Sequence, residues 1–251
     1  IMDYLLEEVL QQQSQQERDF LLCTSILNRF NAPLCNFMLS IDNSQEVIED
    51  LERNNMFIIP LDNERNWFRY HHLFASLLQQ RLALKFKNKL PELHNSASQW
   101  FEKYDQLVFA LEHSLAAGNK EKSIDHFANV INHLWETSQY LTILQFGGMF
   151  THEEIVQNVG LCLNYFWILF QSGDMDQAES LIYKLKNRST DKAVLAMVHV
   201  CINTLKITTG DIESSYTYSE LGIQNINEDV DYWTIFAYLS LAEAHLLRFE
   251  L

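Results

Sequence analysis

The stretch Met56-Phe57-Ile58-Ile59-Pro60-Leu61 decides the fold of the first part of the chain, because it is too short and too bulky for a helix. Trp67-Phe68-Arg69-Tyr70 has the same character. The residues between them, Asp62-Asn63-Glu64-Arg65-Asn66, are polar and favour a turn. Two β-type runs joined by a five-residue connection predict a β-hairpin.

Helical patterns precede this hairpin. Residues 4–10 begin the first, and Ser14-Gln15-Gln16-Glu17 is a capping-box pattern that predicts the start of the next. Asn31-Ala32-Pro33 predicts a further helix start, because proline at a first helical position costs no amide hydrogen bond. Ser44 is expected to cap a helix over residues 45–53. Three helices followed by a hairpin are the parts of a winged helix.

Helix returns after the hairpin. Residues 72–86 carry an apolar stripe at helical spacing, which consists of Leu73, Phe74, Leu77, Leu78 and Leu82. Pro91 begins another helix, and from there the sequence falls into helix pairs. With only seven glycines and three prolines in the chain, long helices joined by short turns are expected.

A small turn signature recurs between the helix pairs. It occurs as Ala116-Ala117-Gly118-Asn119, Gln171-Ser172-Gly173-Asp174 and Thr208-Thr209-Gly210-Asp211, with the glycines 55 and 37 residues apart. Glycine adopts the left-handed conformation that ends a helix, and the following Asn or Asp can cap the next one. An interval of 37 fits a loose tetratricopeptide-like repeat, and residues 132–150 are long enough to add an extra element to the interval of 55. The fold class predicted is therefore mainly α, with a winged-helix-like module and an α-α superhelix.

The charge of the chain is strongly negative. The net charge is -15, of which residues 1–90 carry -3 and residues 91–251 carry -12. A chain this acidic repels a phosphate backbone, so direct nucleic-acid binding is not expected. No signal peptide is visible, and no apolar run approaches the roughly 20 residues that a membrane helix needs. We therefore predict a cytoplasmic location without a membrane partner.

The sequence offers no motif for catalysis. There is no GxxxxGK[ST] phosphate loop, and no histidine pair has metal-ligand spacing with a third partner, so neither an enzyme nor a metal site is predicted. Four cysteines lie in apolar runs without a CxxC pair, which predicts buried free thiols: Cys23, Cys35, Cys162 and Cys201.

Two further groups of residues have alternative interpretations. Arg81, Lys85, Lys87 and Lys89 form a basic cluster that is either a solvated helix end or a contact surface. Several aromatic residues at helical spacing belong either to the core or to a ligand groove, and these are Trp100, Trp135, Tyr165, Phe166, Trp167, Phe170 and Trp233.

Four segments of the chain resemble the MalT-like signal-transduction ATPases (STAND class), which are large ATP-binding, LuxR-type bacterial transcriptional regulators. The segments are residues 19–27 with Pro33-Leu34-Cys35, residues 51–62, residues 67–78, and residues 93–102 with 110–118. Their order and spacing also agree with that family. The resemblance is strong over residues 1–125, weaker at residues 172–178, and generic after about residue 190.

The resemblance implies a nucleotide-sensing residue. In related ATPases a histidine that begins the helix after the winged-helix hairpin contacts the nucleotide phosphate, and His71 holds that position in Tyr70-His71-His72-Leu73. The family has an acid where this chain has His72. His72 and Arg69 are expected to support His71. No cofactor is expected in this chain itself, whereas ATP or ADP is implied for the parent protein.

The resemblance also implies a division and a role. We expect a winged-helix-like module at residues 1–90, a connecting helical arm at residues 91–150, and tetratricopeptide-like repeats, truncated at their C-terminus, at residues 151–251. The expected partners are an upstream ATPase module in the same protein and an inducer or regulatory protein on the repeats. The expected role is a non-catalytic sensor that couples effector binding to the nucleotide switch. The alternative is a tetratricopeptide-type scaffold that binds a protein and switches nothing.

Overall fold

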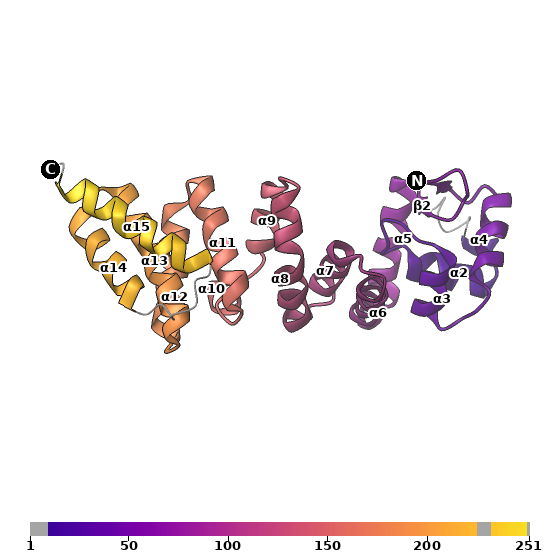
Figure 1. Cartoon of the computed structure of the whole chain (residues 1–251). Coiled ribbons are helices and arrows are strands. Elements are labelled where there is room, and N and C mark those ends of the chain that lie inside the picture. The colour runs from indigo at the N-terminus through magenta and orange to yellow at the C-terminus, as the bar shows by residue number, and fades with distance from the viewer. Residues whose placement is uncertain (1–9, 225–231, 250–251) are drawn as a thin grey trace. The chain divides into compact units, whose positions relative to one another are not determined.

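The computed structural model describes residues 10–224 and 232–249, and nearly all its regular elements are helices (Figure 1). Contacts between residues divide the chain into two compact units, Ile1–His126 (unit 1) and Phe127–Leu251 (unit 2). The helix predicted at residues 4–10 lies, apart from Leu10, outside the described residues. The predicted boundaries at residues 90 and 150 stay a prediction.

Unit 1 consists of a winged-helix module and a helical continuation. Its elements in chain order are α2 (Gln15–Thr24), α3 (Ala32–Leu39), α4 (Ser44–Arg53), β1 (Ile58–Pro60), β2 (Phe68–Tyr70), α5 (His72–Lys85), the 3-10 helix η1 (Lys87–Lys89), α6 (Leu90–Lys103) and α7 (Leu107–Ala116). The next helix, α8 (Lys120–Glu136), contains residues of both units.

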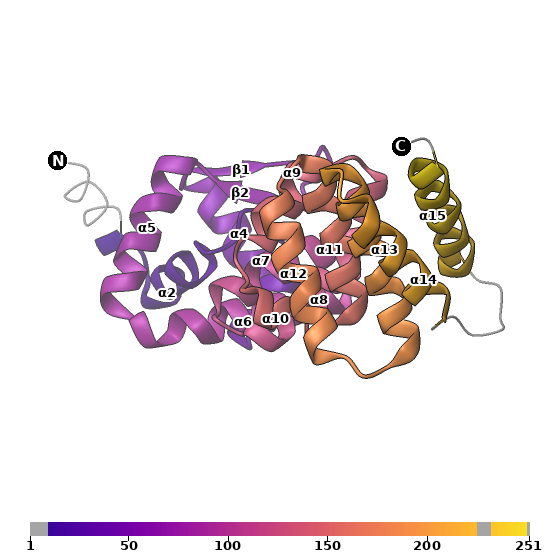
Figure 2. The ribbon, with the colours of Figure 1, turned by 90° about the vertical axis from the view of Figure 1, so that its left-hand side faces the viewer.

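The predicted hairpin is confirmed. Strands β1 and β2 pair in antiparallel fashion, with Ile58 opposite Tyr70 and Pro60 opposite Phe68 (Figure 2). Phe30 adds an isolated bridge to this sheet, because its backbone N–H and C=O each form a 2.8 Å hydrogen bond with Phe68. The buried hydroxyl of Tyr70 lies 2.7 Å from the Thr24 hydroxyl, which ties β2 to α2.

The core of unit 1 holds the helices against the hairpin. Phe20, Ile48 and Leu78 come from α2, α4 and α5, and each is at most 1% exposed. Burying an aliphatic or aromatic side chain of this size contributes about 1.5–3 kcal/mol relative to leaving it exposed. Helix α2 packs on α5, and α3 packs on both α4 and α6. The core thus fixes the point at which the chain leaves β2 and enters α5.

Two of the three predicted helix starts in the winged helix are confirmed. The Ser14 hydroxyl accepts from the Glu17 amide at 3.3 Å, while the Ser14 amide donates to the Glu17 carboxylate at 2.8 Å, which completes the capping box. The Asn31 side chain accepts from the Leu34 amide at 2.9 Å. Ser44, in contrast, is the first helical residue and not the cap. The Ser44 amide donates to the side chain of Asn36 at 3.0 Å, so a residue from the preceding helix satisfies this helix start.

Unit 2 consists of packed helices. After α8, its elements are α9 (Tyr140–Gly147), α10 (His152–Ile155), α11 (Val159–Ser172), α12 (Met175–Arg188), α13 (Lys192–Thr209), α14 (Ile212–Gln224) and α15 (Tyr232–Phe249). Helices α11 to α15 pack in chain order, each on the next. Helix α13 also contacts α15. Helix α9 lies within residues 132–150 and supplies the extra element that the 55-residue interval requires.

The predicted glycine turns are confirmed. Three glycines adopt left-handed conformations, with φ of 73° at Gly118, 83° at Gly173 and 79° at Gly210. The next residue in each case accepts a hydrogen bond from the first turn of the following helix at 3.2–3.3 Å, and these residues are Asn119, Asp174 and Asp211. Each glycine therefore ends one helix and its neighbour starts the next.

The predicted burial of the cysteines is also confirmed, because all four side chains are buried, at 9% exposure for Cys23 and 0% for the other three. Of the helices that the structure describes, none combines the length and the apolar composition required to cross a membrane.

Candidate functional site

His71 lies where the hairpin of unit 1 meets helix α5. It comes directly after β2 and is the N-cap residue of α5. Its amide donates to the Phe57 carbonyl at 2.8 Å, and its carbonyl accepts from the Ala75 amide at 2.9 Å. One hydrogen bond thus fixes His71 to the strand side and the other to the helix side, so the backbone at this position is well determined.

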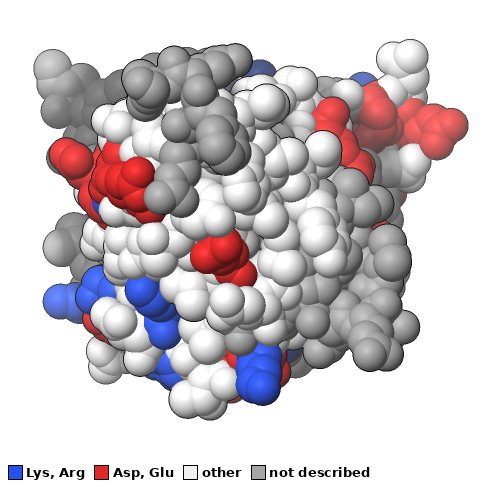
Figure 3. Space-filling model, turned by 60° about the vertical axis from the view of Figure 1, so that its left-hand side comes forward, with Lys and Arg blue, Asp and Glu red and all other residues white. Residues whose placement is uncertain are grey.

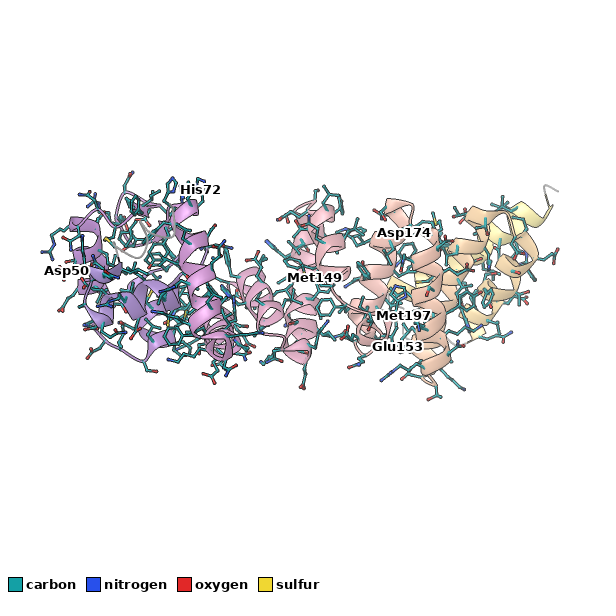
Figure 4. The ribbon with its side chains drawn as sticks, turned by 180° about the vertical axis from the view of Figure 1, so that it is seen from behind. Asp50, His72, Met149, Glu153, Asp174 and Met197 are labelled. Atoms are coloured by element: carbon teal, nitrogen blue, oxygen red, sulfur yellow. The ribbon has the colours of Figure 1, made fainter. Side chains whose placement is uncertain are left out.

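The first turn of α5 has the properties of an anion site. No side chain of the described residues caps it, so its free amides remain available at the positive end of a 14-residue helix. The half-buried His71 ring lies 4.4 Å from the ring of His72, which is exposed at the start of α5 (Figure 4). An imidazole beside uncapped amides can donate hydrogen bonds to a phosphate oxygen.

Arg69 is placed by the hairpin. It is opposite Ile59 in the strand pairing and half-buried, between the buried Phe68 and Tyr70. Its guanidinium donates to the Tyr70 carbonyl at 3.4 Å, so it lies beside the backbone that leads into His71. The roles of His71, His72 and Arg69 toward a nucleotide stay predictions.

Two apolar side chains near His71 were not predicted to be exposed. Leu73 belongs to the predicted apolar stripe of residues 72–86 but is 48% exposed, because the face of α5 that packs consists of Phe74, Leu78 and Leu82. Phe57 is 52% exposed and has a φ of 55°, a conformation that is rare for a bulky residue. Its ring centroid lies 5.1 Å from that of Phe74. Unusual backbone of this kind clusters at functional sites.

The lysines of the basic cluster are exposed to solvent, whereas several of the aromatic residues with alternative interpretations are buried. Lys85, Lys87 and Lys89 are exposed, as expected for a solvated helix end, and the Lys89 ammonium lies 5.1 Å from the centre of the Phe86 ring. Trp100 and Phe166 are buried in the cores of their units, whereas the placement of Trp233 lies outside the described side chains. Tyr165, although only 5% exposed, lines a cavity in unit 2.

A histidine pair in unit 1, half-buried at His94 and buried at His113, was not predicted from the sequence. The Nδ1 atoms of His94 in α6 and His113 in α7 lie 2.9 Å apart, and the His113 ring stacks on Phe101 at 5.5 Å. Burial, and to a lesser degree His94, lowers the pKa of His113 to about 4. A partial signal was available: both residues lie within the helices that flank one short turn, nine residues before the end of α6 and six after the start of α7.

The comparisons with known proteins agree with this architecture. Residues 6–90 match the family model of the MalT winged helix domain. The chain is 27% identical over 245 residues to the HTH-type transcriptional regulator MalT of Klebsiella pneumoniae, an alignment that covers 90% of this chain and 25% of that protein. It is 34% identical over 174 residues to MalT of Yersinia pestis, covering 67% of this chain and 19% of that protein.

A solved structure resembles the chain over its whole length. It is a Signal Transduction ATPase with Numerous Domains protein with a tetratricopeptide repeat sensor from Pyrococcus horikoshii, with a TM-score of 0.64 and 13% identity, covering 99% of this chain and 37% of that one. At this identity the similarity shows the fold alone. The chain spans between about a fifth and a quarter of the length of the MalT proteins it matches, and the matched part is winged helix and helical repeat, not a catalytic part. The chain is thus a MalT-like segment, in which a MalT-type winged helix domain is followed by helical repeats.

Proposed function

We propose that this chain is the non-catalytic regulatory part of a MalT-like, ATP-dependent transcriptional regulator of the cytoplasm. In this role the helical repeats bind an inducer or a regulatory protein, and the winged helix transmits the bound state to an ATPase module that precedes it in the same protein. Such coupling requires two arrangements of the parts to which the effector binds unequally. The chain contributes no chemical step.

The observation that carries the proposal is the position of His71. It follows β2 directly, begins α5, and has uncapped helix amides beside it. When ATP or ADP is bound by the parent protein, it supplies a phosphate anion that these donors fit. His71 would then hold the resting arrangement by a hydrogen bond that exists only while the nucleotide is in place.

Surface charge supports a partner other than nucleic acid. The face seen in Figure 3 is mostly uncharged over its described part, with Lys and Arg in small separate groups. The chain as a whole has a net charge of -15. Counterion release, the main source of affinity for DNA and RNA, requires several basic side chains along a phosphate backbone.

The test uses the longer protein that contains the ATPase module. His71→Ala removes a charge-assisted hydrogen bond to phosphate, which is worth about 1.5–3 kcal/mol, or about a ten- to hundredfold shift in a two-state equilibrium. We expect transcription output in the absence of inducer to rise accordingly, while the melting temperature of the isolated chain stays nearly constant.

His72→Ala is the comparison, because His72 is an exposed neighbour that only supports His71, so we expect it to raise basal output less than His71→Ala does. If His71→Ala destabilised the isolated chain and left basal output unchanged, His71 would be a structural residue. An open reading frame without a phosphate loop upstream would favour the alternative function, a tetratricopeptide-type scaffold without a switch.

A further inference from the structure

Unit 2 contains a cavity of about 790 Å³ between α9, α10, α11 and α12. The two acidic side chains among its described lining residues, Glu153 and Asp174, come from α10 and from the turn before α12 (Figure 4). Its volume is within the range of about 300–1,000 Å³ that is usual for small-molecule sites.

The inner wall is aromatic and apolar. Phe150, Tyr165 and Leu169 line the cavity and are between 3% and 7% exposed. The tip of the Tyr165 ring lies against the Cα of Gly147, where any Cβ would overlap it. The ring is also held edge-on by Phe127 at 6.1 Å. This wall is therefore a preformed surface for the carbon skeleton of a ligand.

The formal charges around the cavity leave one carboxylate without a counter-charge. Glu153 forms an ion pair with Lys184, the only Lys or Arg among the described residues of the lining. Asp174 forms no ion pair in the described part of the chain and accepts one hydrogen bond, from the Gln177 amide at 3.3 Å. His152 adds no positive charge at neutral pH, because burial, and then the charge of Lys184, lowers its pKa. The cavity is thus net negative.

Helix ends add to this negative potential. Helices α9 and α11 both end at the cavity, where Gly147, Gly148 and Ser172 line it, and helix C-termini carry partial negative charge. The partial positive charge at the N-terminus of α12 is compensated by the carboxylate of Asp174, which is the N-cap residue of that helix. The Tyr165 hydroxyl makes no hydrogen bond to any described residue and stays protonated, since burial and the Asp174 charge raise its pKa. An anionic ligand would find no free cation here.

We propose that this cavity binds a small organic cation, a primary ammonium group on an apolar or aromatic body. The ammonium group pairs with Asp174, and the body lies on Tyr165 and Leu169, where the tyrosine ring also favours a positive charge. The Tyr165 hydroxyl accepts or donates one further hydrogen bond. This inference deepens the proposed function, because it rests on the helical repeats being a sensor and names the chemistry of a ligand that they sense.

A series of ligands that share one ring tests the charge preference without any mutation. Phenethylamine, 2-phenylethanol and phenylacetate are titrated into this chain by calorimetry at low ionic strength. We expect phenethylamine to bind about three- to tenfold more tightly than the alcohol, as for a partly exposed ion pair, and phenylacetate to bind most weakly. The preference should shrink as salt is added. Equal binding of the amine and the alcohol, or tighter binding of phenylacetate, would overturn the proposal.

A matched pair of variants locates the ammonium group. Asp174→Asn removes the charge but keeps an excellent helix cap, so the fold is retained. It should abolish the preference for phenethylamine over 2-phenylethanol. Asp211→Asn makes the same change in the equivalent Gly-Asp turn before α14, away from the cavity, and should leave the preference intact. If Asp174→Asn left the preference unchanged as well, the assignment of Asp174 would be wrong.

Binding by the isolated chain separates this inference from the proposed function. Failure of the ligand series would reject the cation site and leave the His71 switch standing. Amine binding together with a silent His71→Ala variant in the longer protein would reject the switch and leave the cation site standing.

Discussion

At the scale of single residues, the pair formed by His94 and His113 makes unit 1 sensitive to acid. One Nδ1 must donate and the other accept across the 2.9 Å contact, so the two rings cannot both be protonated while this hydrogen bond exists. Burial lowers the pKa of both imidazoles, that of His113 to about 4. An unfolded histidine titrates near 6.5, so the unfolded chain binds more protons between about pH 4 and 6.5.

We therefore expect the free energy of unfolding to be fully retained above about pH 6.5 and to fall as the pH decreases toward 4. The contribution of His113 to this loss is about 2–3 kcal/mol. Denaturant unfolding of unit 1, followed by tryptophan fluorescence between pH 7.5 and 4.5, measures it. His113→Gln keeps a hydrogen-bonding group and should flatten the pH dependence, whereas His133→Gln, at an exposed site on α8, should not. A parallel loss in both variants would assign the acid sensitivity to carboxylates.

At the scale of elements, the packing of α9 on α11 depends on one glycine. A Cβ at Gly147 would overlap the ring of Tyr165, so Gly147→Ala should force the ring or the helix to move and cost about 1–3 kcal/mol. Gly160→Ala is the control, because a Cβ there meets only the Asn158 side chain at 3.6 Å. Within helix α11 that change should stabilise the chain by about 0.4–1 kcal/mol. Thermal unfolding of the two variants compares them, and a loss of stability in both would contradict this account of the α9–α11 contact.

The elements also show which features the sequence can predict. The glycine turns and the hairpin were predictable, because each depends on a few neighbouring residues with a definite conformational preference. Ser44 was wrongly assigned as a cap: it is the first helical residue, and its amide donates to Asn36, eight residues earlier in the preceding helix. The bridge between Phe30 and Phe68, the exposure of Leu73 and the left-handed Phe57 likewise depend on tertiary packing.

The two candidate sites also differ in how far the sequence could predict them. The position of His71 at the start of α5 follows from the local strand-to-helix pattern, and the structure places it there. The cavity in unit 2 could not be predicted, because its lining comes from four helices whose side chains are up to 40 residues apart in the chain. Tyr165 and Asp174 were both singled out in the sequence, one as an aromatic residue and one as a cap, but nothing there indicated that they face one space.

At the scale of the whole molecule, the cysteines are distributed evenly between the two units. Cys23 and Cys35 are buried in unit 1, and Cys162 and Cys201 are buried in unit 2. Burial raises the pKa of all four thiols, that of Cys162 to about 12, so the reactive thiolate is scarce in the folded chain. A thiol reagent can therefore modify them mainly when the surrounding unit opens.

Each unit accordingly contains its own chemical reporter of opening. If the units open separately, modification by a disulfide reagent under native conditions will occur in two kinetic phases. Peptide mass analysis will assign one phase to Cys23 and Cys35 and the other to Cys162 and Cys201. Modification of all four thiols at a common rate, equal to the rate of global unfolding, would show instead that the two units open together. An effector that binds unit 2 should slow only the second phase, so that occupancy of a sensor can be measured as protection of two sulfur atoms.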